Sequence, residues 1–257
     1  MDGSRITHHV SRSAMKFDLN CDLGEGEPSL RTRALMRWIT SANVACGGHA
    51  GNTRSMERCV RLAKEFKVRL GAHPGLAADF GRGKVEISPR ELDILLDQQA
   101  GTLETITQTH STKLHHIKLH GSLYHATDQN KDLAMAYANL VRRRWPGVKI
   151  YARAGGLTAQ IARSRHVPVW EEVFADRRYR DDETLVPRDH PAALVSNTEE
   201  VLGFMHRLTV KSQIVSVSGK FLGVKARTIC IHSDTPNAVE LAEVCRQFLE
   251  DGTASQA

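Results

Sequence analysis

Seven short apolar segments, each followed by a longer segment of helical period, constrain the fold of this chain more than any other feature. The segments with strand character are residues 16–21, 42–45, 69–72, 116–119, 148–152, 168–174 and 228–231. The segments with helical character lie near residues 29–39, 53–67, 89–110, 131–145, 157–164, 198–208 and 237–249. Strands that alternate with helices predict repeated βα units around a parallel sheet. A closed or nearly closed barrel and an open doubly wound sheet both fit this alternation.

The 257-residue chain has no Pro- or Ser-rich linker between these units, so residues 15–252 are expected to form one domain. Residues 1–14 are polar, lack the apolar core of a secretory signal, and are expected to be a disordered extension. No apolar run approaches the roughly 20 residues that a membrane-spanning helix requires. The five cysteines include no C-x-x-C pair, which favours a soluble protein of the reducing cytoplasm. Buried thiols are the expected state of Cys21 and Cys46, with a catalytic thiol as the alternative.

The formal net charge of +6 raises the question of nucleic-acid binding. The basic residues are scattered, however, and the densest runs, 142–144 and 177–180, are short. The sequence has no aromatic-rich, glycine-punctuated segment of the kind that stacks bases. We therefore expect the basic surface of an enzyme that acts on small, anionic substrates, with no nucleic-acid or membrane partner.

The first predicted strand carries polar residues at every second position. Successive side chains of a strand point to opposite faces, so Asp18, Asn20 and Asp22 share one face. The apolar residues between them would meet the outer helices. The polar face would then point into the barrel or cleft, where two nearby carboxylates perturb each other's pKa. An antiparallel strand with one face in water is the alternative interpretation.

Histidines and a lysine lie at or near the ends of the next three predicted strands. In the fourth strand, Lys118 and His120 share a face, and the lysine points either to solvent or to an anionic substrate or oxyanion. His49 and His73 lie in glycine-rich turns directly after the second and third strands. With carboxylates, these histidines could bind a divalent metal, or they could act as general acid and base without one. The chain has no H-x-x-x-H or H-E-x-x-H spacing that would decide for a metal.

Two later strands also end in polar residues. The sixth carries Glu171 and Glu172 and is followed by Asp176 and Arg177, and spacing alone does not say which glutamate points inward. The last strand ends in His232. Long polar stretches at 71–84 and 176–191 are expected to be loops beside the site. The sequence has no P-loop, no G-x-G-x-x-G after a strand and no G-x-S-x-G nucleophile elbow.

Taken together, ordered motifs over residues 15–250 closely resemble the LamB/YcsF family. They are D-L-N-C-D-L-G-E (18–25), S-A-N-V-A-C-G-G-H-A-G (41–51), G-A-H-P-G (71–75), F-G-R (80–82), K-L-H-G-S-L-Y (118–124), E-E-V-F-A-D-R-R-Y (171–179), T-L-V-P-R (184–188) and I-H-S-D (231–234). The resemblance implies a (β/α) barrel-like fold of about seven parallel strands, related to the glycoside hydrolase/deacetylase barrels. It also implies cleavage of 5-oxo-L-proline (pyroglutamate) to L-glutamate coupled to ATP hydrolysis, by a protein that works with separate B and C subunits.

The resemblance turns the strand-end cluster into a hypothetical lactam-opening site. The expected catalytic residues are Asp18, Asn20, Asp22, His49, His73, Lys118 and His120. The expected substrate-binding residues are Glu25, Asn43, Glu172, Asp176, Arg177 and His232, with Arg177 a candidate for the substrate carboxylate. A divalent metal, if bound, would take Asp22, His49 and His73. The alternatives are a stand-alone, metal-dependent deacetylase- or amidohydrolase-type hydrolase and a non-catalytic scaffold, which the cost of burying so many ionisable groups disfavours.

Overall fold

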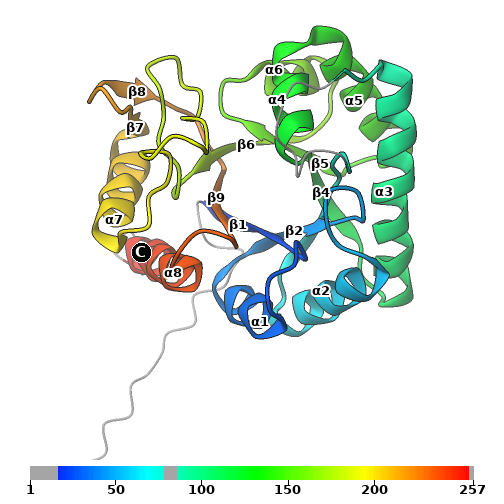
Figure 1. Cartoon of the computed structure of the whole chain (residues 1–257), viewed down its shortest axis with the longest axis horizontal. Helices are drawn as coiled ribbons and strands as arrows, with labels where there is room; N and C mark the ends of the chain where they lie inside the picture. The colour runs from blue at the N-terminus through cyan, green and yellow to red at the C-terminus, as the bar shows by residue number, and fades with distance from the viewer. Residues whose placement is uncertain (1–16, 78–85, 255–257) are drawn as a thin grey trace, which may run out of the picture.

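Seven parallel strands close into a barrel at the centre of the molecule (Figure 1). The computed structural model describes residues 17–77 and 86–254. The strands are β1 (Asp18–Leu23), β2 (Ser41–Ala45), β3 (Arg69–His73), β4 (Leu114–Lys118), β5 (Lys149–Arg153), β6 (Val169–Phe174) and β9 (Thr228–His232). β9 lies between β6 and β1 and pairs with both in parallel register. The predicted parallel sheet is therefore confirmed in its closed form, and the open doubly wound alternative is wrong.

Helices surround the barrel, one or two of them after most of its strands. All seven predicted helices are present, as α1 (Ser29–Trp38), α2 (Thr53–Phe66), α3 (Pro89–Thr109), α5 (Lys131–Arg144), α6 (Leu157–Ser164), α7 (Thr198–His206) and α8 (Ala238–Ala254). One further helix, α4 (Gly121–Gln129), was not predicted. Its sequence begins with glycine directly after the fourth strand and carries no capping side chain, so it lacks the usual signals of a helix start.

Burial follows the alternation of each strand. On β1, Leu19, Cys21 and Leu23 face outward into the hydrophobic layer beneath the helices, and all three are fully buried. The intervening polar residues are also buried, because they point into the barrel interior. Burial desolvates the Cys21 thiol and raises its pKa well above the usual range. All five cysteines are buried and free.

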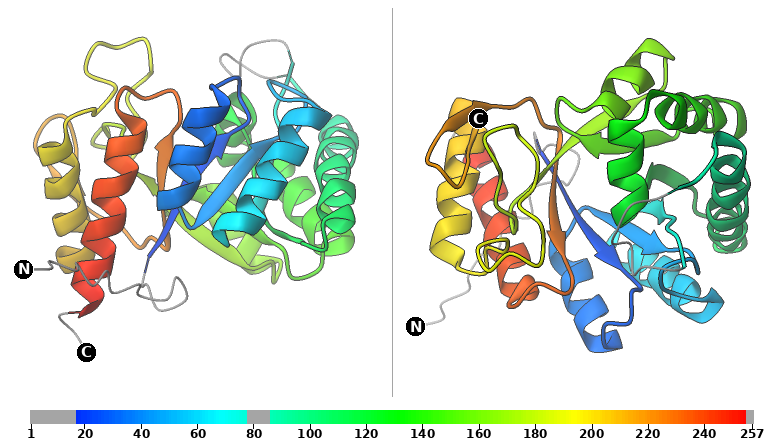
Figure 2. Two further views of the ribbon diagram at one scale, coloured as in Figure 1. Left: turned by 90° about the horizontal axis from the view of Figure 1, so that it is seen from below. Right: turned by 45° about the horizontal axis from the view of Figure 1, so that its top comes forward.

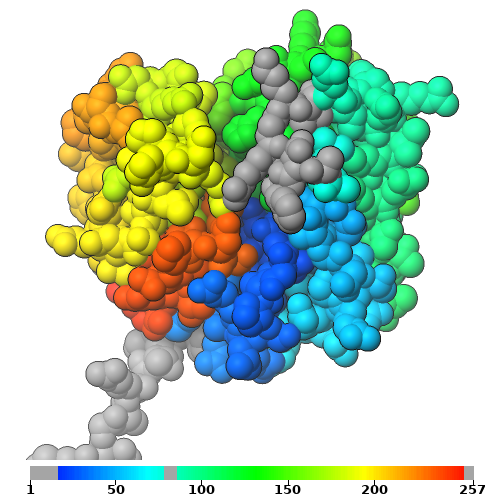
Figure 3. Space-filling view, viewed as in Figure 1, coloured from blue at the N-terminus to red at the C-terminus, as the bar shows by residue number. Residues whose placement is uncertain are grey.

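An accessory layer is inserted between β6 and β9. It contains the irregular segment 175–197, α7, a short π-helical turn (Arg207–Lys211) and the antiparallel hairpin of β7 (Gln213–Val215) and β8 (Phe221–Gly223). Neither the π-helical turn nor the hairpin was predicted, because both are short and weakly patterned. The hairpin lies beside α7, outside the barrel, and α7 packs against α8 (Figure 2). These segments form one continuous lobe of the surface (Figure 3).

The remaining predictions concern two loops and the N-terminal extension. The predicted loop 176–191 is irregular, as expected, whereas the predicted loop 71–84 begins with the last residues of β3. The extension 1–14 and residues 78–84 of the predicted loop 71–84, which include the F-G-R motif at 80–82, lie outside the described residues. Among the described residues, no helix is both long and apolar enough to cross a membrane.

Candidate active site

A buried lysine lies between two buried carboxylates where the strands end. The Lys118 Nζ is 3.0 Å from Asp22 Oδ1 and 3.1 Å from Glu172 Oε1. At most 4% of any of the three side chains is exposed. Charges buried this deeply cost several kcal/mol unless oppositely charged partners compensate them. The lysine is therefore not reaching to solvent, and this trio forms the charged centre of the site.

The three charged groups shift one another's pKa. Burial opposes ionisation of Asp22, but the charges of His73 and Lys118 outweigh it and hold the Asp22 pKa well below its usual range. Burial also opposes the charge on Lys118, but Asp22, Cys230 and Glu172 raise the Lys118 pKa well above its usual value. At Glu172 burial dominates and raises the pKa, with Lys118 opposing. Asp22 and Lys118 therefore stay ionised at neutral pH, while Glu172 is the carboxyl that accepts a proton most readily.

Two amide side chains hold the carboxylates of Asp22 and Glu172 in place by hydrogen bonds. The Asn43 Nδ2 donates to Asp22 Oδ1 at 2.6 Å and to Asn20 Oδ1 at 2.7 Å. The Asn20 Nδ2 in turn donates to Glu172 Oε1 at 2.8 Å. His116 fixes the amide of Asn43, because its Nε2 donates to Asn43 Oδ1 at 2.6 Å. Asn20 and Asn43, both predicted, therefore orient the charged groups. Their amide groups are already hydrogen-bonded within the protein.

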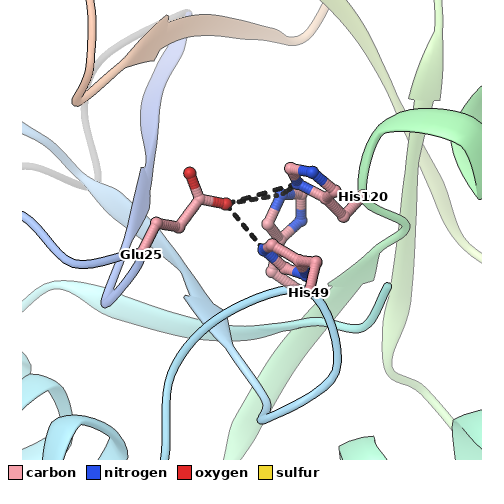
Figure 4. Close-up of side chains that lie close together, drawn as sticks. Glu25, His49 and His120 are labelled. Atoms are coloured by element: carbon pink, nitrogen blue, oxygen red, sulfur yellow. Dashed lines mark hydrogen bonds and ion pairs between the residues drawn. The ribbon is translucent and has the colours of Figure 1, made fainter. Parts of the chain in front are cut away.

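A second group forms directly above this trio, where one carboxylate oxygen meets three histidines. Glu25 Oε1 is 2.8 Å from His49 Nε2, 3.3 Å from His120 Nδ1 and 3.6 Å from His73 Nε2. Figure 4 shows the Glu25 carboxylate pointing at the rings of His49 and His120. His73 connects the two groups, because its Nε2 is also 3.4 Å from Asp22 Oδ2.

The local backbone explains how these four side chains converge. Gly24 and Gly26 have φ of +80° and +109°, so the chain turns sharply after β1 and brings Glu25 over the barrel. The rings of His49 and His120 stack with centroids 3.6 Å apart. A Cβ on Gly75 would lie 2.5 Å from His49 Nδ1, so only glycine leaves room for this stack.

The electrostatics of this second group favour neutral imidazole at His49. Burial, together with the charges of His73 and His120, lowers the pKa of His49 to about 4 despite its hydrogen bond to Glu25. Burial opposes the ionisation of Glu25, but hydrogen bonds from His120 and His49 outweigh it and lower the Glu25 pKa. At neutral pH the group therefore presents an ionised carboxylate that accepts from the Nε2–H of a neutral His49, whose lone pair lies on the buried Nδ1.

Asp176 and His232 form a third, adjacent pair. The carboxylate of Asp176 accepts from His232 Nδ1 at 3.0 Å, from the His232 backbone N–H at 2.8 Å and from the Thr235 hydroxyl at 2.6 Å. Burial opposes ionisation, but the charge and hydrogen bonds of His232 and the hydroxyl of Thr235 lower the Asp176 pKa. The other ring nitrogen of His232 lies 3.8 Å from Asp22 Oδ2, so Asp176 orients His232 toward the charged centre.

Two predicted site residues lie apart from these groups. Asp18, at the start of β1, lies at the opposite end of the barrel interior and contacts hydroxyl groups and Arg69 there. Arg177 donates from Nη2 to the Val186 carbonyl at 2.7 Å and lines a cavity of about 340 Å³ against α7 and β7. Among the described residues, neither contacts Lys118 or the histidine group.

Two further residues, neither of them predicted, contact the charged centre. Tyr124, on the unpredicted helix α4, donates its hydroxyl to Glu172 Oε2 at 3.2 Å. Cys230 Sγ lies 3.1 Å from Lys118 Nζ. Strand alternation from His232 would have placed Cys230 on the inner face, but a cysteine between apolar residues carries no signal of a partner for a lysine. Glu172, not Glu171, points inward, which resolves the ambiguity that spacing left.

Two sets of side chains offer several metal-ligand atoms within 4.8 Å of one another. One comprises Glu25, His49, His73 and His120, and the other comprises Asp22, Cys230 and His232. The expected metal set of Asp22, His49 and His73 coincides with neither. It lacks Glu25 and His120, which the turn after β1 and the start of α4 bring to the same point.

These observations define the class of protein: a parallel (β/α) barrel with a buried acid–base site where its strands end. Residues 17–257 match the model of the LamB/YcsF family. The chain belongs to this family.

Relatives of known name are similar over nearly the whole chain. The A subunit of 5-oxoprolinase from Staphylococcus haemolyticus (strain JCSC1435) is 38% identical over 240 residues, 91% of this chain and 96% of the relative. That of Pyrococcus horikoshii is 37% identical over 242 residues, 92% of this chain and 95% of the relative. The crystal structure of the lactam utilization protein from Thermus thermophilus has a TM-score of 0.84 and 34% identity, covering 93% of this chain and 97% of that one.

Proposed function

We propose that this chain is the A subunit of an ATP-dependent 5-oxoprolinase, which opens 5-oxo-L-proline to L-glutamate together with separate B and C subunits. The names of the relatives support this substrate and the division into subunits. The observation that carries the proposal is the buried lysine between Asp22 and Glu172, directly beneath the Glu25–histidine group. Hydrolysis of a lactam requires a stabilised oxyanion, an activated water and a proton for the nitrogen, and this site can supply each.

Lys118 is the group suited to the developing negative charge. Its ammonium is buried, permanently ionised and held by Asp22 and Glu172, so it need not reorganise when charge forms on the lactam oxygen. His120, at the start of α4, would add a second donor. ATP would supply phosphorylation of that oxygen, which makes the carbonyl carbon electrophilic.

Activation of water and protonation of the nitrogen fall to different groups. Glu25 is the group suited to activate water, because its carboxylate is ionised and 21% of its side chain is exposed, whereas the lone pair of neutral His49 lies on its buried Nδ1. Glu172 is the carboxyl whose pKa burial raises, so it suits a proton donor to the ring nitrogen. Asp22 would hold Lys118 and His73 in place. Asp18, which lies at the other end of the barrel, has a structural role in this proposal.

The substrate carboxylate needs a cation near the mouth of the barrel. Arg177 was expected to bind it, but its guanidinium donates to the Val186 carbonyl beside α7. Arg188, from the same irregular segment, pairs with Asp234 at 2.5 Å. Burial lowers the pKa of Arg188, but Asp234 and the site carboxylates Asp176 and Asp22 outweigh it and raise the pKa. Arg188 is therefore a second candidate for the substrate carboxylate beside Arg177, and comparison of KM in Arg188→Leu and Arg177→Leu decides between them.

The decisive assay measures pyroglutamate consumption and glutamate release by the purified chain, with and without ATP and the candidate B and C subunits. We expect turnover only when ATP and both partners are present. Substitution of Asp22, His73 or Lys118 by Ala should abolish it. Near-wild-type turnover of these variants in the reconstituted system would refute the assignment of the site.

A stand-alone, metal-dependent amidohydrolase or deacetylase is the second candidate function. The four converging donor atoms of Glu25, His49, His73 and His120 favour it. It differs in its requirements, because it needs neither ATP nor partner subunits. Hydrolysis of amide or acetyl substrates by the isolated chain in the absence of ATP would favour this candidate over the first.

A further inference from the structure

We propose that Glu25, His49, His73 and His120 form a binding site for one divalent transition-metal ion of the zinc class. The site occupies the mouth of the barrel, directly above Asp22. The proposal concerns the same pocket as the proposed function and goes beyond it, because metal binding does not depend on which substrate is opened.

Four of the six separations between these donor atoms are close to those that such an ion requires, and the parallel rings of His49 and His120 would have to turn out of their stack for both nitrogens to face one ion. Ligand atoms about 2.0–2.1 Å from a tetrahedral zinc are roughly 3.3 Å from one another. Here Glu25 Oε1 is 2.8, 3.3 and 3.6 Å from the facing nitrogens of the three histidines. The His120 Nδ1 and His73 Nε2 are 3.0 Å apart. Three imidazole nitrogens and one carboxylate oxygen are a donor set typical of zinc.

The second nitrogen of His73 orients its ring for coordination. Its Nδ1 is 2.8 Å from the Lys118 carbonyl oxygen, which can only accept a hydrogen bond. The proton of neutral His73 therefore lies on Nδ1, and the lone pair of Nε2 faces Glu25 and His120. A backbone carbonyl that fixes the tautomer in this way is the usual outer partner of a metal-bound histidine.

The protons of the metal-free group can be replaced by one cation. Without a metal, His49 Nε2–H and His120 Nδ1–H must donate to Glu25 or to His73, because neither acceptor carries a proton. When a divalent ion binds, neutral His49 and His120 would each carry their proton on the other ring nitrogen, so that His49 Nε2 and His120 Nδ1 become ligands beside His73 Nε2 and Glu25 Oε1.

The neighbouring set of Asp22, Cys230 and His232 is not the site, because a cation of the protein already fills it. The Lys118 Nζ lies 3.0 Å from Asp22 Oδ1 and 3.1 Å from Cys230 Sγ. A metal there would face a buried ammonium at close range. This difference gives a matched control, since His232 is a nearby histidine outside the proposed set.

The experiment titrates Zn²⁺ into chelator-treated full-length chain, without ATP, substrate or partners, and measures stoichiometry and affinity by calorimetry and elemental analysis. We expect one Zn²⁺ per chain, with affinity falling as pH is lowered and no displacement by Mg²⁺. His49→Ala, His120→Ala and Glu25→Gln should each weaken Zn²⁺ binding by at least about 100-fold, more than the loss of an outer partner causes. His232→Ala should bind Zn²⁺ like the wild type.

Two outcomes would overturn the proposal. One is the absence of stoichiometric Zn²⁺ binding by the wild type, and the other is binding that is lost in His232→Ala but kept in His49→Ala and His120→Ala. Circular dichroism of the metal-free variants, above all of the near-isosteric Glu25→Gln, separates loss of ligands from loss of fold. The lactam assay is independent: zinc binding without ATP-dependent turnover rejects the proposed function alone, and turnover by zinc-free protein rejects only a catalytic use of the metal.

Discussion

Asp18 and Asp22 are two buried carboxylates on the same face of β1, four residues apart, and they meet opposite surroundings. Asp18 accepts hydrogen bonds at 2.5–3.1 Å from four hydroxyl groups and one guanidinium, those of Thr40, Ser41, Tyr151, Thr228 and Arg69. Asp22 contacts an ammonium, an amide and imidazole rings, those of Lys118, Asn43, His73 and His232. One end of the barrel interior is closed by hydroxyl donors, while the other gathers groups that can change protonation or bind a ligand.

The difference shows why two similar carboxylates need not share a function. An ionised carboxylate has about four lone-pair positions, and the donors around Asp18 occupy them. Such a carboxylate ties the start of β1 to β2, β5 and β9 but has nothing left for substrate. At Asp22 the partners are themselves titratable, so the same carboxylate controls their charge. The hydroxyl-bound end is suited to stability and the ion-paired end to chemistry.

The largest expected contrast is between Asp22→Asn and Asp18→Asn in the reconstituted oxoprolinase assay. Asp22→Asn removes the charge that holds Lys118 and His73, and we expect kcat to fall by about 10²–10⁴-fold, the range for loss of acid–base function. Asp18→Asn should lower stability but cost far less activity per folded molecule. Equal losses of kcat in the two variants, measured at matched folded fractions, would erase the distinction between the two ends.

Lys118→Met tests the ion-paired end through stability. The substitution leaves Asp22 and Glu172 buried and facing each other without their shared cation, so we expect a loss of about 3–5 kcal/mol in the free energy of unfolding. Lys113→Met, at an exposed position just before β4, should change it by less than about 0.5 kcal/mol. Urea denaturation at neutral pH measures both. Equal losses of unfolding free energy in Lys118→Met and Lys113→Met would contradict the stabilising role of the Lys118 ion pairs.

The different surroundings of Asp18 and Asp22 could be predicted only in part from the sequence. Strand alternation correctly placed Asp18, Asn20 and Asp22 on one inward face, because period-2 geometry depends only on local backbone. It could not say which end of the barrel each would occupy or which donors would meet it. Those donors come from other strands, such as Tyr151 of β5 and Thr228 of β9, and only closure of the barrel brings them together.

The elements that were missed share a physical cause. Helix α4 and the β7–β8 hairpin are short, and their stability comes from packing against neighbours more than from their own periodicity. Glu25 and His120 lie on the turn and helix start that follow strands, so their convergence depends on backbone geometry such as the positive φ of Gly24. The strong, repeated patterns of the barrel strands and outer helices were predicted because burial of one face dominates them.

Tyr151→Phe tests the hydroxyl-bound end with a smaller change. It removes one hydroxyl that donates to Asp18 Oδ2 at 3.1 Å while keeping the ring that stacks on His116. We expect a loss of about 1.5–3 kcal/mol in unfolding free energy, the range for a hydrogen bond to a charged group, and unchanged kcat. Tyr137→Phe, which removes a buried hydroxyl from a neutral backbone acceptor, is the control and should cost less. A fall in kcat without a fall in stability would show that the hydroxyl-bound end around Asp18 takes part in catalysis, which contradicts the assignment of the chemistry to the end around Asp22.

The smallest expected effect concerns Asp176, which combines both kinds of partner in the Thr235 hydroxyl and the His232 ring. Its pKa is lowered in the folded protein although burial opposes the shift, so its contribution to stability is modest. A lowered folded pKa means that this stability is present above the unfolded pKa of about 3.9 and is lost as pH falls below it. Asp176→Asn should therefore be less stable than the wild type at pH 7, with the difference shrinking between about pH 5 and pH 3. Urea titrations at several pH values measure this difference, and a gap that stayed constant down to pH 3 would show that Asp176 acts through its hydrogen bonds and not through its charge.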